Sequence, residues 1–467
     1  MAEQIFSPVN SPLRGSIEVP GDKSIASRAI FLAAMAEGKS HIYNVPKSLD
    51  VMTVANAVKD LGAKVEIKDS SSSMRNVNMV IEGWGKKGPQ SLKDVIQCDN
   101  SATCARVLLG ILAPFDIKQV IDGDESLHRR PFMRIVDPLM QMGAQLKVVA
   151  QKTSEPQRSS LPMEIQGSSS VSPIFYEMPV ASSQAKTSIL FAGANINGDT
   201  SVIEPCQSRN HGELLLKAFG ADLDIDEDMF CTTIHGPANL HCASLHIPGD
   251  VSSAAYYLTA AALVPGSKIT IKNVGINKTR LGFVRALQRM GSRIEIKEHD
   301  RLEMLRKGYD YCGEPVGDIT VQYAGRLNNI IVQSYEIPQM IDEIPILAMA
   351  AACAEGESIF YGVKELKLKE SNRIHAISEG LTLLGTKAFD KADTLYVEGG
   401  IDIEAQTSTY PTEKEIKLFH HFDHRLAIVW ALMGKCGYIP IRINNFDISN
   451  VSYPHFMDDF NALVLNK

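Results

Sequence analysis

Hydrophobic and polar positions along the chain repeat one pattern several times. A polar stretch leads into a short, almost wholly apolar helix, and a glycine-containing turn leads into a strand that alternates apolar and polar positions. The clearest copies span 22–45, 182–205, 249–274 and 341–363, and weaker copies span 99–122 and 422–445. The copies lie roughly 70–90 residues apart, which is far longer than the period of a solenoid repeat.

A second pattern alternates with the first. It consists of an amphipathic helix that ends at a glycine and is followed by another alternating strand, and a glycine in this place is typical of a left-handed helix C-cap. The copies span 57–68, 138–149, 214–225 and 286–297, with a degraded copy at 380–389. A sixth copy would fall at the C-terminus, where FMDDFNALVL supplies a last helix. We therefore expect six βαβ-containing units, arranged as two sets of three.

The helices of the first pattern also predict how the layers are arranged. AIFLAAMAEG, AYYLTAAALV and PILAMAAACA are apolar on almost every face, and a helix of that kind is buried rather than laid on a surface. The strands beside them alternate, so each sheet has one face toward solvent. One arrangement consistent with both patterns places the helices inside each domain and the sheets outside. A doubly wound α/β sheet with buried crossover helices is the other, and periodicity alone does not separate them.

The repeats indicate where the chain divides. The boundary between the two sets of three lies near 246–249, with a counterpart near 20–24, so the first twenty residues should pair with the C-terminal half. This predicts a discontinuous domain of residues 1–21 and 248–467 and a second domain of residues 22–247. Surface loops are expected at the polar stretches 69–76, 151–160 and 404–415.

Composition narrows the class of protein. With 467 residues, 45% of them hydrophobic and 22% charged, the chain is too large for one core and is neither disordered nor fibrous. The formal net charge of −7 argues against non-specific nucleic-acid binding. The sequence has no apolar run of membrane-spanning length, no signal-peptide pattern, and eight cysteines without a CxxC or CxxH pair. We expect a cytoplasmic enzyme with reduced thiols and no zinc site.

Several helices of the first pattern begin with cations, although the partial positive charge of a helix N-terminus repels each one by about 0.3–1 kcal/mol. These cations are Lys23, Arg28, Arg106, Lys186 and Arg425. An anion bound at such a helix end would interact favourably with the N–H groups, the dipole and the cation together. For any single residue, a solvated side chain explains the pattern equally well. Recurrence at equivalent repeat positions favours anion binding for the set.

Two further clusters carry charges that suit anionic ligands. Arg129 and Arg130 precede a proline in DESLHRRP, a loop suited to bidentate binding of phosphate or carboxylate. If KLKESNR opens a helix, Lys369 and Arg373 share one face with Glu370 beside them. A solvated helix face would give the same run of charges.

Asp342 and Glu343 lie in an otherwise apolar segment, IPQMIDEIPILAMAAA. Buried carboxylates need partners or a chemical task, so one of this pair is a candidate general base. The structural alternative is that Asp342 serves only as the N-cap of the helix that follows.

Nine segments are similar to the motifs of a known family and occur in the family's order from about residue 13 to 457. They are LRGSIEVPGDKSIASRA, NSATCAR, GDESLHRRP, VASSQAK, PGDVSSAA, the stretch from IDEIPIL through AEG, ELKLKESNRI, DHRLA and VSYPHF. The chain thereby resembles the 5-enolpyruvylshikimate-3-phosphate synthases (3-phosphoshikimate 1-carboxyvinyltransferases). The resemblance implies a two-domain inside-out α/β barrel with three repeats in each domain and a site in the cleft between the domains.

The resemblance also implies a reaction. The enolpyruvyl group of phosphoenolpyruvate would be transferred to the 5-hydroxyl of shikimate 3-phosphate, with release of phosphate, in aromatic amino acid biosynthesis. Both small-molecule substrates carry several negative charges, which would account for the cationic helix starts. The family uses no metal or organic cofactor, and we expect none here. We also expect a monomer that binds neither nucleic acid nor membrane.

Roles for single residues follow from the matched motifs. Asp342 matches the general base, Glu370 the proton donor, and Lys23 the lysine between the two substrates. Matches to ligands of shikimate 3-phosphate are Ser24, Arg28, Ser182, Ser183, Arg209 and Lys369, and matches around phosphoenolpyruvate are Gln184, Arg130, Arg373 and Arg425.

The chain departs from the family pattern at five positions. Ala26 and Ser27 replace a Ser-His pair, and asparagine replaces aspartate at 210 and 372. Ala102 stands where the family usually has glycine, and its methyl group would project toward the phosphoenolpyruvate site. We therefore predict low sensitivity to glyphosate, the family's inhibitor.

Two other functions stay open at this point. A related enolpyruvyl transferase acting on a UDP-amino sugar uses a reactive cysteine in a flexible loop beside Arg-Pro, but DESLHRRP has none. Cys104 lies in an apolar helix, where a thiol is inert. A non-catalytic anion-binding paralogue would explain the departures, although Asp342 and Glu370 are both retained.

Overall fold

The computed structural model describes residues 3–9, 11–70, 73–149, 160–404, 407–408 and 415–464. Residues 151–159 and most of 404–415 lie outside the described residues, so two of the predicted loops are not tested. The third prediction is wrong: the stretch at 69–76 belongs to a hairpin of strands β4 (Lys64–Ser70) and β5 (Ser73–Glu82). Composition alone does not distinguish a polar strand such as Arg75–Asn76 from a loop.

The chain folds into two compact units. Unit 1 comprises Met1–Pro20, Pro248–Glu303 and Pro315–Lys467, and unit 2 comprises Gly21–Ile247 and Met304–Glu314. The units differ from the predicted domains at Gly21 and at the segment 304–314, which leaves unit 1 and returns to it.

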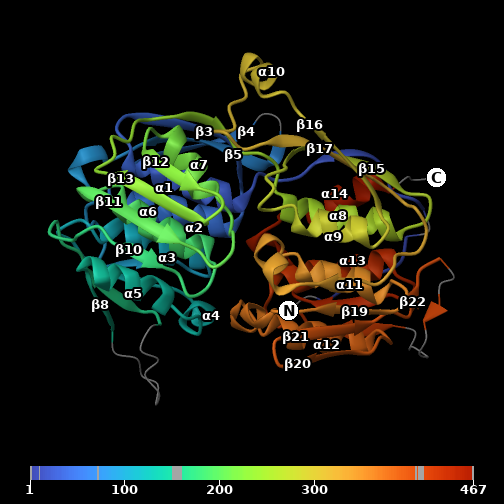
Figure 1. Cartoon of the computed structure of the whole chain (residues 1–467). Helices are drawn as coiled ribbons and strands as arrows, with labels where there is room; N and C mark the ends of the chain where they lie inside the picture. The colour runs from blue at the N-terminus through green and yellow to red at the C-terminus, as the bar shows by residue number, and fades with distance from the viewer. Residues whose placement is uncertain are drawn as a thin grey trace. The chain divides into compact units, whose positions relative to one another are not determined.

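Three buried helices form the centre of unit 2, and each leads into a strand, as the first sequence pattern predicts. The helices are α1 (Lys23–Met35), α3 (Ala102–Leu112) and α6 (Ser183–Gly193), and the strands are β3 (Lys39–Pro46), β7 (Lys118–Asp122) and β11 (Gly198–Ile203). Figure 1 shows these helices running beside one another in the left part of the view.

The second pattern supplies the remaining helices of unit 2 and a β-hairpin after each one. The helices are α2 (Leu49–Asp60), α5 (Met133–Met142) and α7 (His211–Ala218), and the hairpins are β4 with β5, β8 (Gln145–Val148) with β9 (Met163–Gln166), and β12 (Asp222–Asp226) with β13 (Cys231–Gly236). Edge strands β6 (Val95–Gln97), β10 (Phe175–Glu177) and β14 (Ser244–His246) complete three sheets of one strand order, β14-β3-β5-β4, β6-β7-β9-β8 and β10-β11-β13-β12.

Unit 1 repeats this organisation. Its central helices are α8 (Val251–Leu263), α11 (Ile344–Ala352) and α13 (His424–Cys436), and the strands after them are β15 (Lys268–Gly275), β19 (Glu357–Phe360) and β25 (Ile441–Asn444). Its outer helices are α9 (Gly282–Arg289), α12 (Arg373–Leu383) and α14 (Phe456–Leu463). Its sheets run β16-β17-β15-β2, β18-β19-β21-β20 and β1-β25-β24.

Two strands of these sheets come from the N-terminal residues. Besides β15, β19 and β25, the strands are β1 (Glu3–Phe6), β2 (Arg14–Glu18), β16 (Arg293–Glu298), β17 (Val316–Gln322), β18 (Ile331–Val332), β20 (Ala388–Lys391), β21 (Thr394–Glu398) and β24 (Ile416–Leu418). Strand β2 pairs with β15, β1 pairs with β25, and Leu13 forms a bridge with Val464. The predicted pairing of the first twenty residues with the C-terminal half is confirmed.

The inside-out arrangement is confirmed within each unit. All thirteen residues of α8 are buried, whereas β15 alternates between buried and more exposed positions. The predicted C-cap glycines all have the left-handed φ that an L side chain rarely adopts; they are Gly62, Gly143, Gly220, Gly291 and Gly385. Every helix in the described part of the chain is too short or too polar to cross a membrane.

Candidate active site

The N-termini of α1, α3 and α6 lie close together in unit 2. Asp22 caps α1 by accepting hydrogen bonds from the N–H groups of Ser24 and Ile25, while Ser101 and Ser182 cap α3 and α6. Helix N-termini carry partial positive charge, so three of them near one place favour an anion there.

Arg28 connects the start of α1 with the start of α6. Its guanidinium donates to the carbonyl of Ser24 at 3.0 Å and to Ser183 Oγ at 3.0 Å, and only 2% of the residue is exposed. Arg209 Nη1 lies 3.5 Å from Ser24 Oγ. The structure therefore brings Ser24, Arg28, Ser183 and Arg209 together, as the sequence predicts for a phosphate site.

Lys23 lies at the same helix end. Its ammonium group forms a 2.5 Å ion pair with Asp50, which is the second residue of α2. The side chain stays 20% exposed, so Lys23 is partly open to solvent.

A second candidate group joins α6 to α3. Gln184 accepts from Arg106 Nη1 at 2.7 Å and donates to Thr103 Oγ1 at 2.8 Å. Ala102 is the first residue of α3 and is 7% exposed. Arg130, which follows the short helix α4 (Glu125–His128), donates to Asn100 at 3.2 Å. The candidate residues for phosphoenolpyruvate in unit 2 thus lie around the start of α3.

Lys186 does not behave as the sequence predicts. Its ammonium lies 2.6 Å from Glu204 and 2.6 Å from Glu213, and all three side chains are buried. Its negative partners are therefore carboxylates of the chain itself, and its place in α6 is no sign of a bound ligand. The pairing joins residues far apart in the sequence, which no local pattern reveals.

In unit 1, Asp342 is surrounded by three of the predicted cations. Its carboxylate lies 3.9 Å from Lys369, 3.7 Å from Arg373 and 3.6 Å from Arg425. The N-cap alternative is wrong, because the N-cap position of α11 is held by Glu343, whose side chain makes no capping hydrogen bond. This candidate base is therefore a carboxylate surrounded by positive charge.

The segment KLKESNR is not one helix, so the predicted shared face of Lys369 and Arg373 is wrong. The 3-10 helix η3 (Lys364–Leu368) ends before Lys369, and α12 begins at Arg373 because the Asn372 side chain caps it through the N–H of His375. Glu370, in the connection, forms a 2.5 Å ion pair with Arg373. Lys369, Glu370 and Arg373 still lie close to one another and to Asp342, but the connection between η3 and α12 brings them together, not one helix face.

Asp423 is a site residue that sequence reasoning missed. This buried carboxylate accepts from Arg373 Nε at 2.6 Å and caps α13 by accepting from the N–H of Arg425 at 2.9 Å. Its position before a helix that begins with two basic residues was the available signal. Asp423 thereby fixes the places of both arginines.

The surroundings of Asp423 and Arg425 favour the charged form of both side chains. Burial raises the pKa of Asp423, but the charge and hydrogen bond of Arg373, together with His424, lower it by more, so the pKa lies below its usual value. Burial lowers the pKa of Arg425, but Asp342, Tyr256, Glu343 and Asp250 together raise it by more, so the net pKa is well above the ordinary value. The arginines stay cationic at any physiological pH.

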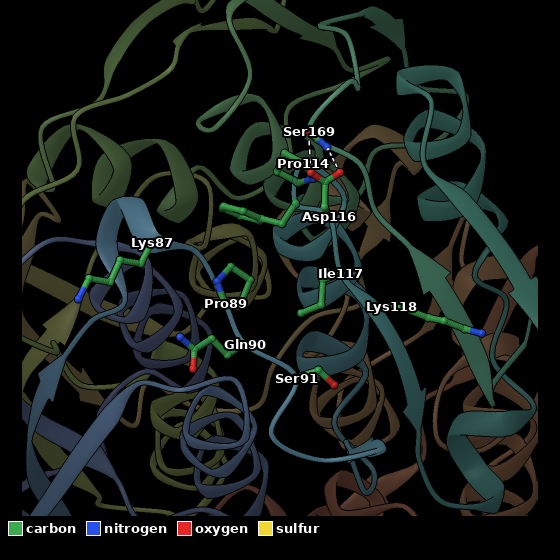
Figure 2. Close-up of a pocket in the computed structure, with 10 residues that line it drawn as sticks. Lys87, Pro89, Gln90, Ser91, Pro114, Asp116, Ile117, Lys118 and Ser169 are labelled. Carbon is green, nitrogen blue, oxygen red and sulfur yellow. Dashed lines mark hydrogen bonds between the residues drawn. The ribbon is translucent and has the colours of Figure 1, made fainter.

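One hollow of unit 2 is lined by other residues. It has a volume of about 570 Å³ and is lined by Lys87, Pro89, Gln90, Ser91, Pro114, Phe115, Asp116, Ile117, Lys118 and Ser169. Figure 2 shows Asp116 turned toward Ser169, from which it accepts two 2.8 Å hydrogen bonds. None of the candidate residues lines this hollow. No set of three or more His, Cys, Asp or Glu residues suited to a metal occurs among the residues that the structure describes.

Comparison with known proteins decides the family. The family model described as EPSP synthase (3-phosphoshikimate 1-carboxyvinyltransferase) matches residues 9–460. The chain belongs to the EPSP synthase family. A 3-phosphoshikimate 1-carboxyvinyltransferase of Desulforamulus reducens is 37% identical over 463 residues, covering 99% of this chain and 100% of the relative. One from Coxiella burnetii (strain CbuK_Q154) is 36% identical over 454 residues, covering 97% and 95%.

Solved structures agree with the family. An EPSP synthase from Acinetobacter baumannii has a TM-score of 0.81 and 32% identity, and the match covers 100% of this chain and 99% of that one. The enolpyruvyl transferase NikO from Streptomyces tendae has a TM-score of 0.74 at 17% identity over 99% and 97%, which shows the fold alone. Together these likenesses favour the inside-out barrel over the doubly wound sheet.

The cysteine expected to be inert fits that role. Cys104 is fully buried in α3, and burial raises the pKa of its thiol well above the usual value. A buried thiol of raised pKa is a poor nucleophile. Nothing at Cys104 favours the UDP-amino-sugar alternative.

Proposed function

We propose that this chain transfers the enolpyruvyl group of phosphoenolpyruvate to the 5-hydroxyl of shikimate 3-phosphate and releases phosphate, as a step of aromatic amino acid biosynthesis. The match to the EPSP synthase family over residues 9–460, which includes every candidate residue, carries the proposal. The chemistry of the site residues supports it, because both substrates are anions, the unit 2 residues supply guanidinium groups and hydroxyls, and the group around Asp342 supplies Lys369, Arg373 and Arg425.

Residues of unit 2 are proposed to bind the phosphate of shikimate 3-phosphate. The α6 N-terminus offers the hydroxyls of Ser182 and Ser183, and Arg28 already donates to Ser183 at 3.0 Å. Ser24 and Arg209 add a hydroxyl and a second guanidinium to the same place. Hydroxyl donors, guanidinium groups and a helix N-terminus are the groups that bind phosphate in proteins.

The group around Asp342 is proposed to perform the proton transfers. Asp342 removes the proton of the 5-hydroxyl, and the oxygen adds to the enol carbon of phosphoenolpyruvate while Glu370 protonates its methylene. As phosphate leaves, Glu370 takes one of the three hydrogens of the methyl group so formed, and Asp342 releases the hydroxyl proton to solvent. Lys369 binds shikimate 3-phosphate, and Arg373 and Arg425, with Arg130, Gln184 and Lys23, bind phosphoenolpyruvate. Positioned acids and bases of this kind contribute roughly 10²–10⁴-fold each.

The test is release of inorganic phosphate by the purified full-length chain. We expect phosphate to appear with shikimate 3-phosphate and phosphoenolpyruvate together, and not when either is left out. A UDP-amino sugar in place of shikimate 3-phosphate serves as the acceptor control. Phosphate release with that acceptor alone, or no release at all under conditions in which both substrates bind, contradicts the proposal.

Sensitivity to glyphosate gives a further prediction about Ala102. The residue opens α3 beside Thr103, which accepts from Gln184. An added methyl in a tightly filled site costs about 1–3 kcal/mol, so we expect the Ala102→Gly variant to be inhibited at roughly tenfold lower glyphosate concentration. The measurement is inhibition against phosphoenolpyruvate for both proteins. Inhibition of the natural chain at glyphosate levels near the KM for phosphoenolpyruvate would refute the prediction.

A further inference from the structure

The connection between β11 and α7 in unit 2 carries a buried carboxylate at each end. Glu204 follows β11 directly, and Glu213 lies in the first turn of α7. Between them, in the loop 204–213, lies Arg209, whose guanidinium reaches Ser24 Oγ at 3.5 Å. The loop therefore places the Arg209 guanidinium at the candidate phosphate site, and the carboxylates of Glu204 and Glu213 lie at the two ends of the loop.

Lys186 holds both ends of this loop. Its ammonium is 2.6 Å from Glu204 Oε2 and 2.6 Å from Glu213 Oε1. Glu204 Oε2 also accepts from the N–H of Ser208 at 3.4 Å, which closes the loop on the same carboxylate. We call Lys186, Glu204 and Glu213 the Lys186 cluster.

The three side chains of the cluster are buried. Its side chains are at most 4% exposed. Burial lowers the pKa of Lys186, but Glu213 and Glu204 raise it by more, so the net pKa lies above the ordinary value. Such a cluster is costly to bury and constrains geometry strongly, because each group loses its counter-charge if the loop moves.

Lys186 also belongs to the helix that supplies the candidate phosphate ligands. Its N–H bonds to the carbonyl of Ser182, and Ser183 in the same turn accepts from Arg28. A displacement of the loop relative to α6 would therefore move Arg209 relative to Ser183 and Arg28. At the α7 end of the loop there is one more contact, in which His211 Nδ1 lies 2.6 Å from the carboxylate of Glu314.

We propose that Lys186 is a positioning residue for Arg209: by joining Glu204 and Glu213 it sets the loop so that Arg209 faces Ser24 and Arg28 and binds the phosphate of shikimate 3-phosphate. The inference rests on the proposed function for the identity of the ligand. Lys186 itself does not touch the substrate.

The test uses a variant that removes all three charges of the cluster, so that none is left buried without a partner. Lys186→Met alone leaves two buried carboxylates without a cation, so Glu204→Gln and Glu213→Gln are added to it. We expect the triple variant to bind shikimate 3-phosphate about tenfold or more weakly by calorimetry, since small misplacements of a binding group have large effects, while kcat at saturating substrate changes less than about threefold. Lys186→Arg keeps both ion pairs and is expected to bind within about threefold of the natural chain.

Two further variants separate positioning from a general loss of stability. Ile165→Ala removes a buried side chain of β9 in the same unit. It is expected to lower Tm without weakening shikimate 3-phosphate binding. Arg209→Ala is expected to weaken binding, and adding the triple variant to it should weaken binding by no more than about twofold further, because the cluster acts through Arg209.

The outcomes distinguish the two proposals. If Arg209→Ala weakens binding but the triple variant does not, the positioning role of Lys186 is overturned and the proposed function stands. If the two effects multiply in the combined variant, Lys186 does not act through Arg209. If the natural chain releases no phosphate and does not bind shikimate 3-phosphate, the proposed function itself fails.

Discussion

Replacement of Asp342 by asparagine is expected to lower kcat by about 100-fold or more, which is the usual scale for removal of a positioned base. Asparagine keeps the shape of the side chain but neither accepts a proton from a hydroxyl nor balances the charges of Lys369, Arg373 and Arg425. Those cations lie 3.6–3.9 Å from the carboxylate. The KM for phosphoenolpyruvate is expected to stay the same or fall, because the group becomes more positive toward an anion.

The control for this experiment is Asp393→Asn, in the exposed turn between β20 and β21. It makes the same chemical change far from the candidate residues of unit 1 in the sequence and is expected to leave kcat and KM unchanged. Steady-state kinetics with both substrates measures the two variants side by side. A kcat for Asp342→Asn within a few-fold of the natural value would remove Asp342 from the role of base.

The repeats show what the sequence predicts well. The apolar helices, the alternating strands and the glycines that end the outer helices are local patterns, and each reflects the environment of its own residues. Gly143, for example, ends α5 with φ of 111°, as its place after PLMQM predicts. The order of the units follows from the order of the patterns.

The pairing of charges was not predictable in the same way. Arg373 lies against Asp423, fifty residues further along the chain, and Lys186 lies against Glu204 and Glu213. Which carboxylate meets which cation depends on how the helices pack, and no periodicity in the sequence contains that information. A continuous helix through KLKESNR, considered as one possibility from the sequence, does not form for a related reason, since one capping side chain, Asn372, sets the start of α12.

The structure gives Arg373 more carboxylate partners than the sequence suggested. It contacts Asp423 at 2.6 Å, Glu370 at 2.5 Å and Asp342 at 3.7 Å. Burial lowers the pKa of Arg373, but Asp423 and Glu370 raise it by more, so it remains cationic. Asp423 accepts from both Nε and Nη2 of Arg373, and Glu370 shares Nη2, so an anion that binds through Nη2 competes with Glu370. Binding of phosphoenolpyruvate is therefore expected to loosen the Glu370 ion pair and leave Glu370 free to carry a proton.

Replacement of Glu370 by glutamine tests that exchange and is expected to lower kcat by about 100-fold or more, because an amide does not donate an acidic proton to the methylene carbon. Glutamine still accepts a hydrogen bond from Arg373 Nη2, so Tm should change little. In deuterated water, the natural enzyme is expected to place deuterium on the methylene carbon of recovered phosphoenolpyruvate, and the variant should do so far more slowly.

The matched control is Glu357→Gln, an exposed residue of β19 in the same unit, which is expected to change neither turnover nor deuterium incorporation. A Glu370→Gln enzyme with slow turnover but normal deuterium incorporation would mean that another group protonates the methylene. Glu370 would then act on Arg373 instead, by keeping its charge compensated until the anion arrives. Loss of both turnover and incorporation, with phosphoenolpyruvate binding unchanged by calorimetry, is the result expected for proton transfer by Glu370 itself, since the arginine keeps its hydrogen-bond acceptor in the variant.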